Sequence, residues 1–312
     1  MKRQPPELAV RGSPATAVPD WLPLALALAI VVVWGATPVL TKLAAAEIEP
    51  LTVAVLRTVL GGVVAAPLAL ALRLPLPPRS LALPFAISSF CAFVGFPVLF
   101  TIGQRMTSAM HGGLILAALP ILTGLYAAAV ERRRPKARWW TGCAVAMAGE
   151  VVLIAGRAPA GQAAASLGGD LLVVLSTLLA AMGYVAGARM SQAGYASIAT
   201  TLWGVAAGSV LIAPIFPFAA GGWSLPEASP AAWGAIATLA WATSIIGYIG
   251  WYWALARGGI ARIGTIQFLQ PLSGLVLAYF LLAERPSFTL IAATALILSG
   301  VVVARSQPRT AR

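Results

Sequence analysis

Apolar stretches recur along almost the whole chain and are separated by short polar segments. A bilayer core of about 30 Å is crossed by a helix of about 20 apolar residues. Ten stretches approach this length, spanning residues 21–43, 50–72, 81–103, 108–130, 139–156, 170–189, 197–219, 231–253, 260–282 and 287–304. The pattern predicts an all-α polytopic membrane protein with ten transmembrane helices, in which helices joined by short connections pack antiparallel.

The longest connection is the Gly/Ala/Ser-rich segment 157–169, which divides the ten stretches into two sets of five. We expect a cytoplasmic tail at 1–20, a five-helix repeat at 21–156, an external linker, a second repeat at 170–304 and a cytoplasmic tail at 305–312. The first tail precedes a long apolar run and lacks a clear small-residue cleavage site. The first helix is therefore predicted to remain in the protein.

Composition supports this fold class and excludes a soluble one. The 312 residues are 60% hydrophobic and only 10% charged, whereas soluble domains carry about 25% charged residues. The net charge of +12 would suggest nucleic acid in a soluble protein. Here the basic residues lie between the apolar runs, so membrane topology explains them and no nucleic-acid partner is expected.

The distribution of Lys and Arg predicts the orientation, because cytoplasmic loops carry an excess of these residues. With the N-terminus in the cytoplasm, most basic residues outside the helices lie on the cytoplasmic side. The opposite side carries only Lys42, Arg105, Arg157 and Arg285. The abundance of Arg and Ala indicates a GC-rich bacterial genome. We therefore expect a multi-pass protein of the bacterial inner membrane, with both termini in the cytoplasm and lipid around its helices.

The two halves of the chain share a pattern of prolines and glycines. The matching positions are Gly113 and Gly264, Pro120 and Pro271, Pro135 and Pro286, and Gly149 and Gly300. Because each half has an odd number of predicted helices, the second half must be inserted upside down relative to the first. Inverted repeats are the recurring architecture of secondary transporters, whose substrate sites lie near the membrane midplane between the repeats.

Several segments resemble the drug/metabolite transporter superfamily, specifically its EamA-type branch. They are the WGATPVLTK stretch from Trp34 to Lys42, the region around Arg57, the junctions Pro120–Pro135 and Pro271–Pro286, and the GYVAGARM stretch from Gly183 to Met190. The resemblance covers residues 21–305. It implies a five-plus-five inverted repeat, a central substrate cavity and, in many members, export of a small metabolite. Alternating access would then expose the cavity to one side at a time.

Catalytic chemistry has little to use in this sequence. The chain has one His, His111, and nine acidic residues, most of which lie in tails, loops or helix ends. A membrane enzyme would need clustered His and carboxylates or an activated nucleophile. Cys91 and Cys143 fall inside apolar runs and are interpreted as buried hydrophobic residues. We expect a transporter with no catalytic residue, cofactor or metal; a scaffold or assembly subunit, a channel and a membrane enzyme are the alternatives.

Aromatic and polar residues within the predicted helices are candidates for lining a substrate cavity. They are Trp34, Thr37, Tyr184, Trp241, Gln267 and Gln270. Their alternative role is packing or hydrogen bonding between helices. Pro38, Pro120 and Pro271 are expected to interrupt their helices and expose backbone groups to the cavity. An aromatic-lined and nearly uncharged pathway would suit a neutral, zwitterionic or amphipathic small molecule.

Two charges fall inside predicted helices, Arg57 and Glu150. Their depths match, which permits an ion pair; alternatively, Arg57 snorkels or binds elsewhere, and Glu150 serves the substrate or a proton. His111 is a candidate gate residue or a plain interfacial polar residue. Gly204 and Gly208 form a G-x-x-x-G pattern, which permits close packing within the chain or a homodimer contact.

Overall fold

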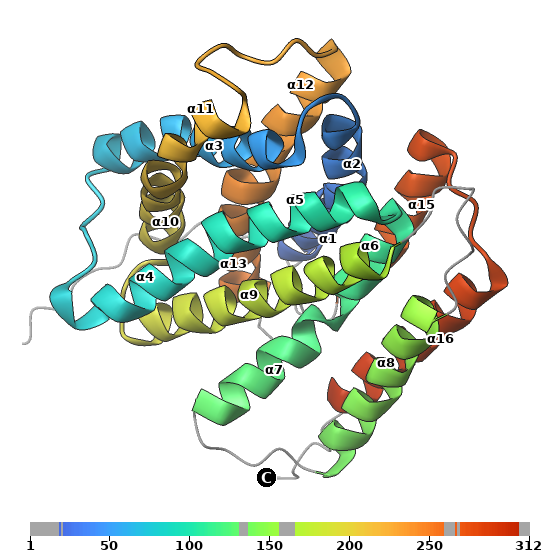
Figure 1. Cartoon of the computed structure of the whole chain (residues 1–312). Coiled ribbons are helices and arrows are strands. Elements are labelled where there is room, and N and C mark those ends of the chain that lie inside the picture. Colours follow the sequence, from blue (N-terminus) through green and yellow to red (C-terminus); the bar gives the residue numbers. More distant parts are fainter. Residues whose placement is uncertain are drawn as a thin grey trace, which may run out of the picture.

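The computed structural model describes residue 19 and residues 21–130, 137–155, 166–258, 266 and 269–305. All secondary structure in this part of the chain is helical. The α-helices are α1 (Trp21–Gly35), α2 (Thr37–Glu47), α3 (Pro50–Ala71), α4 (Ala82–Phe90), α5 (Phe96–Met106), α6 (Ala109–Ile115), α7 (Leu119–Val130), α8 (Ala137–Ala155), α9 (Leu167–Gln192), α10 (Ser197–Ile212), α11 (Phe216–Ala219), α12 (Pro230–Ala237), α13 (Gly247–Gly258), α15 (Gln270–Leu282) and α16 (Phe288–Arg305). Figure 1 shows their arrangement.

Several of these helices join into longer apolar rods. Within the described residues, seven stretches are long and apolar enough to cross a membrane: Trp21–Glu47, Pro50–Ala71, Arg79–Met106, Ala109–Val130, Leu167–Gln192, Ser197–Ala219 and Pro230–Trp251. The helices α8, α15 and α16 lie where three further spans are predicted. The all-α membrane fold is confirmed. The count of ten spans stays a prediction, because part of the ninth, 260–282, lies outside the described residues.

The long rods are interrupted where the sequence places proline or where the helix changes its winding. Short 3-10 segments are η1 (Arg79–Leu81), η3 (Leu116–Ala118) and η4 (Ala213–Ile215), and π-helical segments are η2 (Cys91–Gly95) and η5 (Thr238–Ile246). A turn at Ala36 separates α1 from α2. Pro38, Pro120 and Pro271 are each the second residue of a helix, namely α2, α7 and α15. Proline is tolerated there because the first turn has no internal acceptor for its missing N–H.

Five helices begin at the same end of the bundle, each with a side-chain cap. The capping residues are Glu49, Ser108, Ser166, Ser229 and Ser287, which accept hydrogen bonds from the first turns of α3, α6, α9, α12 and α16. Two contacts join these helix starts across the bundle: Ser229 N donates to Glu47 at 2.7 Å, and Ser166 N donates to Met106 O at 3.0 Å. We call this side, with the segments 47–50, 106–109, 220–229 and 283–287, the capped end.

The opposite end contains the segments between α3 and η1 and between α9 and α10. The Tyr195 hydroxyl donates to Pro75 O at 2.7 Å, and Trp203 Nε1 donates to Leu74 O at 3.4 Å. Burial raises the pKa of the Tyr195 phenol. These bonds satisfy carbonyl groups of an extended segment that has no helical partner of its own.

Helices α8 and α16 pack along each other (Figure 1), and their contact is symmetric. A Cβ on Gly149 would lie 2.9 Å from Ile297 N, and a Cβ on Gly300 would lie 2.3 Å from Ala146 N. Gly149 and Gly300 are 151 positions apart, as are Ala146 and Ile297 and the matched prolines of the two halves. The contact of Gly149 with Ile297 is therefore repeated, with the halves exchanged, by the contact of Gly300 with Ala146. A two-fold relation between the halves requires such a repeated contact.

Much of the outer surface is apolar, as a bilayer requires. Phe218 and Phe288 are both 86% exposed, and soluble monomers rarely expose large contiguous apolar patches to water. The G-x-x-x-G pattern of α10 faces the interior: a Cβ on Gly204 or Gly208 would lie within 3 Å of Phe93. These glycines therefore permit close packing inside the chain.

Candidate functional site

A cavity of about 50 Å³ lies between helices from both halves of the chain. It is lined by Trp34, Thr37, Arg57, Ala92, Phe93, Phe96, Leu116 and Leu119 from the first half, and by Ala180, Tyr184, Thr243, Ser244, Tyr248 and Gln270 from the second. A space of this size holds a few water molecules. Of the residues proposed from sequence, the structure brings together Trp34, Thr37, Arg57, Tyr184 and Gln270.

Most of the lining residues lie where a helix is interrupted. Trp34 and Thr37 flank the turn between α1 and α2, and Gln270 is the first residue of α15. Phe93 lies in π-helical η2, and Thr243 lies in π-helical η5. Interrupted helices release backbone groups that a lipid environment could not satisfy, so such breaks occur where helices line a cavity. Single π-helical turns are likewise frequent at functional sites.

Hydrogen bonds from side chains hold the interrupted segments in place. Trp34 Nε1 donates to Thr243 O at 3.0 Å, which joins the first half to the second. The Thr58 hydroxyl donates to Phe93 O at 3.1 Å. The cavity walls are thus fixed at the points where the regular helical hydrogen bonding is disturbed.

Four aromatic rings form a continuous group on one side of the cavity. Tyr248 lies at its centre, with ring centroids 5.4 Å from Trp34, 5.9 Å from Phe93 and 5.8 Å from Tyr184. The interplanar angles of 57–75° are those of edge-to-face or tilted pairs, which the charge distribution of aromatic rings favours. The group offers apolar faces to a molecule in the cavity.

Arg57 is the only Lys or Arg among the cavity-lining residues. It lies in the middle of α3 and is 4% exposed. Its Nη1 atom is buried and has no hydrogen-bond partner within the described structure. The side chain of Glu150, one alternative partner considered from the sequence, lies outside the described residues. Its helix α8 packs mainly along α16, whereas α3 packs mainly along α10.

Two of the residues proposed from sequence, Trp241 and Gln267, are not among the described residues that line this cavity. Trp241 does not line this cavity: its side chain is 41% exposed, and its Nε1 donates to Leu60 O at 2.9 Å. Regular α-helical periodicity would put Trp241 and Tyr248, seven residues apart, on one face. The wider π-helical winding between them rotates Tyr248 into the cavity and leaves Trp241 outside. Gln267 lies outside the described residues.

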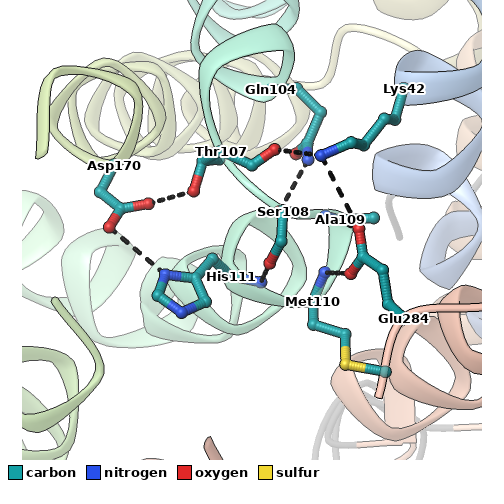
Figure 2. A network of polar contacts seen from close by, with 9 residues as sticks. All are labelled: Lys42, Gln104, Thr107, Ser108, Ala109, Met110, His111, Asp170 and Glu284. Carbon is teal, nitrogen blue, oxygen red and sulfur yellow. Dashed lines mark hydrogen bonds and ion pairs between the residues drawn. The ribbon is translucent and has the colours of Figure 1, made fainter. Parts of the chain in front are cut away.

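A second group of polar residues lies at the capped end and joins the two halves of the chain (Figure 2). Glu284, between α15 and α16, accepts hydrogen bonds from Ala109 N at 2.8 Å and from Met110 N at 2.9 Å. Its Oε1 lies 3.7 Å from Lys42 Nζ, which donates to Thr107 O at 2.6 Å. A carboxylate of the second half thereby satisfies free N–H groups at the start of α6 in the first.

The other carboxylate of this group is Asp170 of α9, which is completely buried. It accepts a hydrogen bond from the Thr107 hydroxyl at 2.5 Å and lies 3.3 Å from His111 Nδ1. The Ser108 hydroxyl accepts from His111 N at 3.0 Å, and Gln104 Nε2 donates to Ser108 O at 2.9 Å. The gate candidate His111 is therefore part of a buried network that spans both halves, as Figure 2 shows.

The sequence did not single out several residues of these two sites. Thr243 and Ser244 lie in π-helical η5 and Tyr248 lies just after it in α13, so a regular helical pattern did not place them at the cavity. Asp170 and Glu284 were assigned to a helix start and a loop, where acids are usually solvated. For Glu284 the sequence did contain a signal: Lys42 was predicted to lie on the same side of the membrane, so an ion pair between these two residues could have been considered. Within the described residues, no group of three or more His, Cys, Asp or Glu side chains could hold a metal ion.

Comparison with known proteins relates the chain to transporters. The EamA-like transporter family matches residues 21–155 and 167–306. The uncharacterized transporter YdeK of Bacillus subtilis (strain 168) is 28% identical over 85% of this chain and 90% of its own. The probable amino-acid metabolite efflux pump of Salmonella typhimurium (strain LT2) is 28% identical over 89% and 93% of the two chains.

A solved crystal structure with 20% sequence identity has the same fold. It covers 90% of this chain and 96% of its own, with a TM-score of 0.62. The two family matches cover nearly all of the described residues. With its apolar helices and its symmetric α8–α16 contact, the chain belongs to the EamA-like transporter family and is a multi-pass membrane transporter.

Proposed function

We propose that the protein exports a small metabolite across the bacterial inner membrane by alternating access around the central cavity. The observation that carries this proposal is the cavity itself, which lies between the two repeats and is lined at their helix interruptions. A site in this position becomes accessible from either side when the repeats rock against each other. The similarity to a relative named as a probable efflux pump supports export as the direction.

The polar network at the capped end supports the proposed rocking motion. Its polar contacts cross from one repeat to the other: Lys42 meets Glu284, and His111 meets Asp170. Separating the repeats at this end requires these contacts to break together. We propose that the capped end is external and that the network closes the outer side of the cavity in this conformation. The distribution of Lys and Arg supports this orientation.

The volume of the cavity fits a closed conformation. About 50 Å³ is far below the roughly 300–1,000 Å³ of sites that enclose drug-sized molecules. A metabolite larger than a few water molecules therefore needs the cavity to widen, which movement of one repeat against the other provides. The lining would offer aromatic faces and a few polar groups to the bound molecule.

An untargeted comparison of metabolites inside and outside cells tests the proposal. Cells that produce the protein should accumulate less of one or a few small molecules inside and more outside than cells without it. Each molecule that changes is then tested with purified protein in proteoliposomes. Unchanged metabolites together with no flux for a broad panel of molecules would instead support a non-transporting scaffold.

A matched pair of variants tests whether flux passes through this cavity. Thr243→Leu places a larger side chain in the lining and should abolish flux, while Thr238→Leu should retain it. Both residues lie in η5, and both hydroxyls donate to the carbonyl four residues earlier, but only Thr243 lines the cavity. Equal flux in the two variants at equal protein amounts would place the pathway elsewhere.

A further inference from the structure

The central cavity contains a positive charge that the described protein does not neutralise. An Arg side chain remains protonated in proteins, and a buried charge is unfavourable unless it is paired and hydrogen-bonded. Arg57 is 4% exposed and lines the cavity, yet one guanidinium nitrogen is both buried and without a hydrogen-bond partner. Among the described residues, Arg57 has no ion-pair partner that would balance this charge.

The described carboxylates are placed elsewhere. Asp170 and Glu284 are held by the network at the capped end. Glu47 accepts from Ser229, and Glu49 caps α3. Glu227 is exposed in the segment that leads to α12. The helix that carries Glu150 packs mainly along α16 and not along the helix of Arg57.

The lining also indicates what kind of anion would fit. Arg57 is its one basic residue, and it contains no Asp or Glu, so a single negative charge balances it. The planar guanidinium matches a carboxylate with two parallel hydrogen bonds. A phosphate ester carries more charge and more acceptor oxygens than one guanidinium satisfies. The rings of Trp34, Phe93 and Tyr248 would contact an apolar remainder, while Gln270 and Ser244 offer hydrogen bonds to further polar groups.

We propose that Arg57 binds the carboxylate of the transported molecule, which makes the substrate a carboxylate-bearing metabolite with an apolar or aromatic remainder. This inference rests on the proposed transport through the central cavity. It assigns to α3 the part of the site that recognises charge, and to the aromatic group of the cavity the part that recognises shape.

The experiment compares metabolite export by cells that produce the wild-type protein, Arg57→Gln, Arg57→Lys, Arg189→Gln or no protein. Arg189 is the matched control, because it is exposed in the last turn of α9 and does not line the cavity. The metabolites that depend on the wild-type protein should all carry a free carboxylate. Export should be lost in Arg57→Gln, reduced in Arg57→Lys and unchanged in Arg189→Gln, at equal amounts of protein in the membrane.

A second measurement does not depend on how the variants fold. Each carboxylate-bearing metabolite found in this way is compared with its primary amide in proteoliposomes that contain the wild-type protein. Loss of a charge-assisted pair is expected to raise the apparent KM by about 10- to 100-fold. The amide should show this rise with the wild-type protein.

The outcomes separate this inference from the proposed function. Export of molecules that lack a carboxylate, phosphate esters included, or equal transport of acid and amide would overturn the role of Arg57 and leave transport standing. Export by Arg57→Gln at the wild-type rate would do the same. If no metabolite depends on the protein and the liposomes show no flux, the proposed function fails and this inference fails with it.

Discussion

The completely buried Asp170 carboxylate of the second repeat lies 3.3 Å from His111 Nδ1 of the first. Thr107 donates to the other carboxylate oxygen. Because a buried carboxylate depends on such donors, the two repeats stabilise each other at this point. Any motion that opens the capped end must replace these contacts with water.

We predict that Asp170→Asn favours the conformation in which the capped end is open. The amide lacks the negative charge and one acceptor oxygen, which weakens the closed state by about 1–3 kcal/mol. The measurement uses a cysteine placed at Ser244, in protein whose Cys91 and Cys143 are replaced, and an impermeant reagent added to intact cells. This cysteine should react at least about fivefold faster when Asp170→Asn is present than when Asp170 is unchanged. Glu227→Gln, on an exposed acid at the same end, should leave the rate unchanged. A slower or equal rate in Asp170→Asn would contradict the role of the network as a gate.

We predict that Gln270→Ala impairs transport and that Trp241→Ala does not. Gln270 lines the cavity, so loss of its hydrogen bonds to a bound molecule should raise the apparent KM by about 2- to 10-fold. Trp241 is largely outside and donates to a backbone carbonyl of α3. Flux per amount of folded protein is the measurement. Impaired flux in Trp241→Ala with normal flux in Gln270→Ala would contradict this site. Trp241 would then line the pathway, as regular helical periodicity leads one to expect.

We predict opposite effects of two Gly→Ala substitutions on stability. A Cβ on Gly300 would lie 2.3 Å from a backbone nitrogen of α8, so Gly300→Ala forces α8 and α16 apart and should cost about 1–3 kcal/mol. A Cβ on Gly234 of α12 meets nothing within 4 Å, and Ala is the better helix former by about 0.5–1 kcal/mol. Thermal unfolding in detergent should show a lower midpoint for the first variant and an equal or higher one for the second. Equal midpoints would exclude the close α8–α16 contact.

A double-mutant cycle tests whether Arg57 pairs with Glu150, which the sequence left open. A direct pair predicts that each single Ala variant is impaired and that the double variant is no worse than the poorer single one. The packing of α3 and α8 on different partners leads us to expect additive losses instead. Coupling between the two residues would overturn the assignment of Arg57 to the substrate. If Glu150→Gln alone abolishes pH-driven transport at normal expression, Glu150 becomes the candidate for proton coupling.

The orientation is tested by single cysteines at Lys136 and Gln162 in intact cells. The positive charge of the 131–138 segment predicts that position 136 is cytoplasmic and silent toward an impermeant reagent. Position 162, in the linker between the repeats, should react. The reverse result would invert the topology and place the polar network on the cytoplasmic side.

The sequence alone determined the class of protein and much of its layout. Runs of about 20 apolar residues have no stable place in water, so the spans from Trp21–Glu47 to Pro230–Trp251 could be located in advance. Pro38, Pro120 and Pro271 marked points where helices are interrupted, because proline cannot continue a regular helix. The spacing of Gly149 and Gly300 exposed the repeat, since only glycine permits the backbone approach seen between α8 and α16.

Only the tertiary structure decided which residues meet. Arg57, Gln270 and Tyr248 lie far apart in the chain, and no local pattern states that three different helices present them to one cavity. The π-helical winding of η5 left the candidate Trp241 outside the cavity and placed Tyr248, which the sequence did not single out, in its lining, because such widening follows from packing and has no reliable mark in the sequence. Asp170 and Glu284 looked like solvated acids until the opposite repeat supplied their donors, since burial of a charge depends on partners that the sequence near it does not contain.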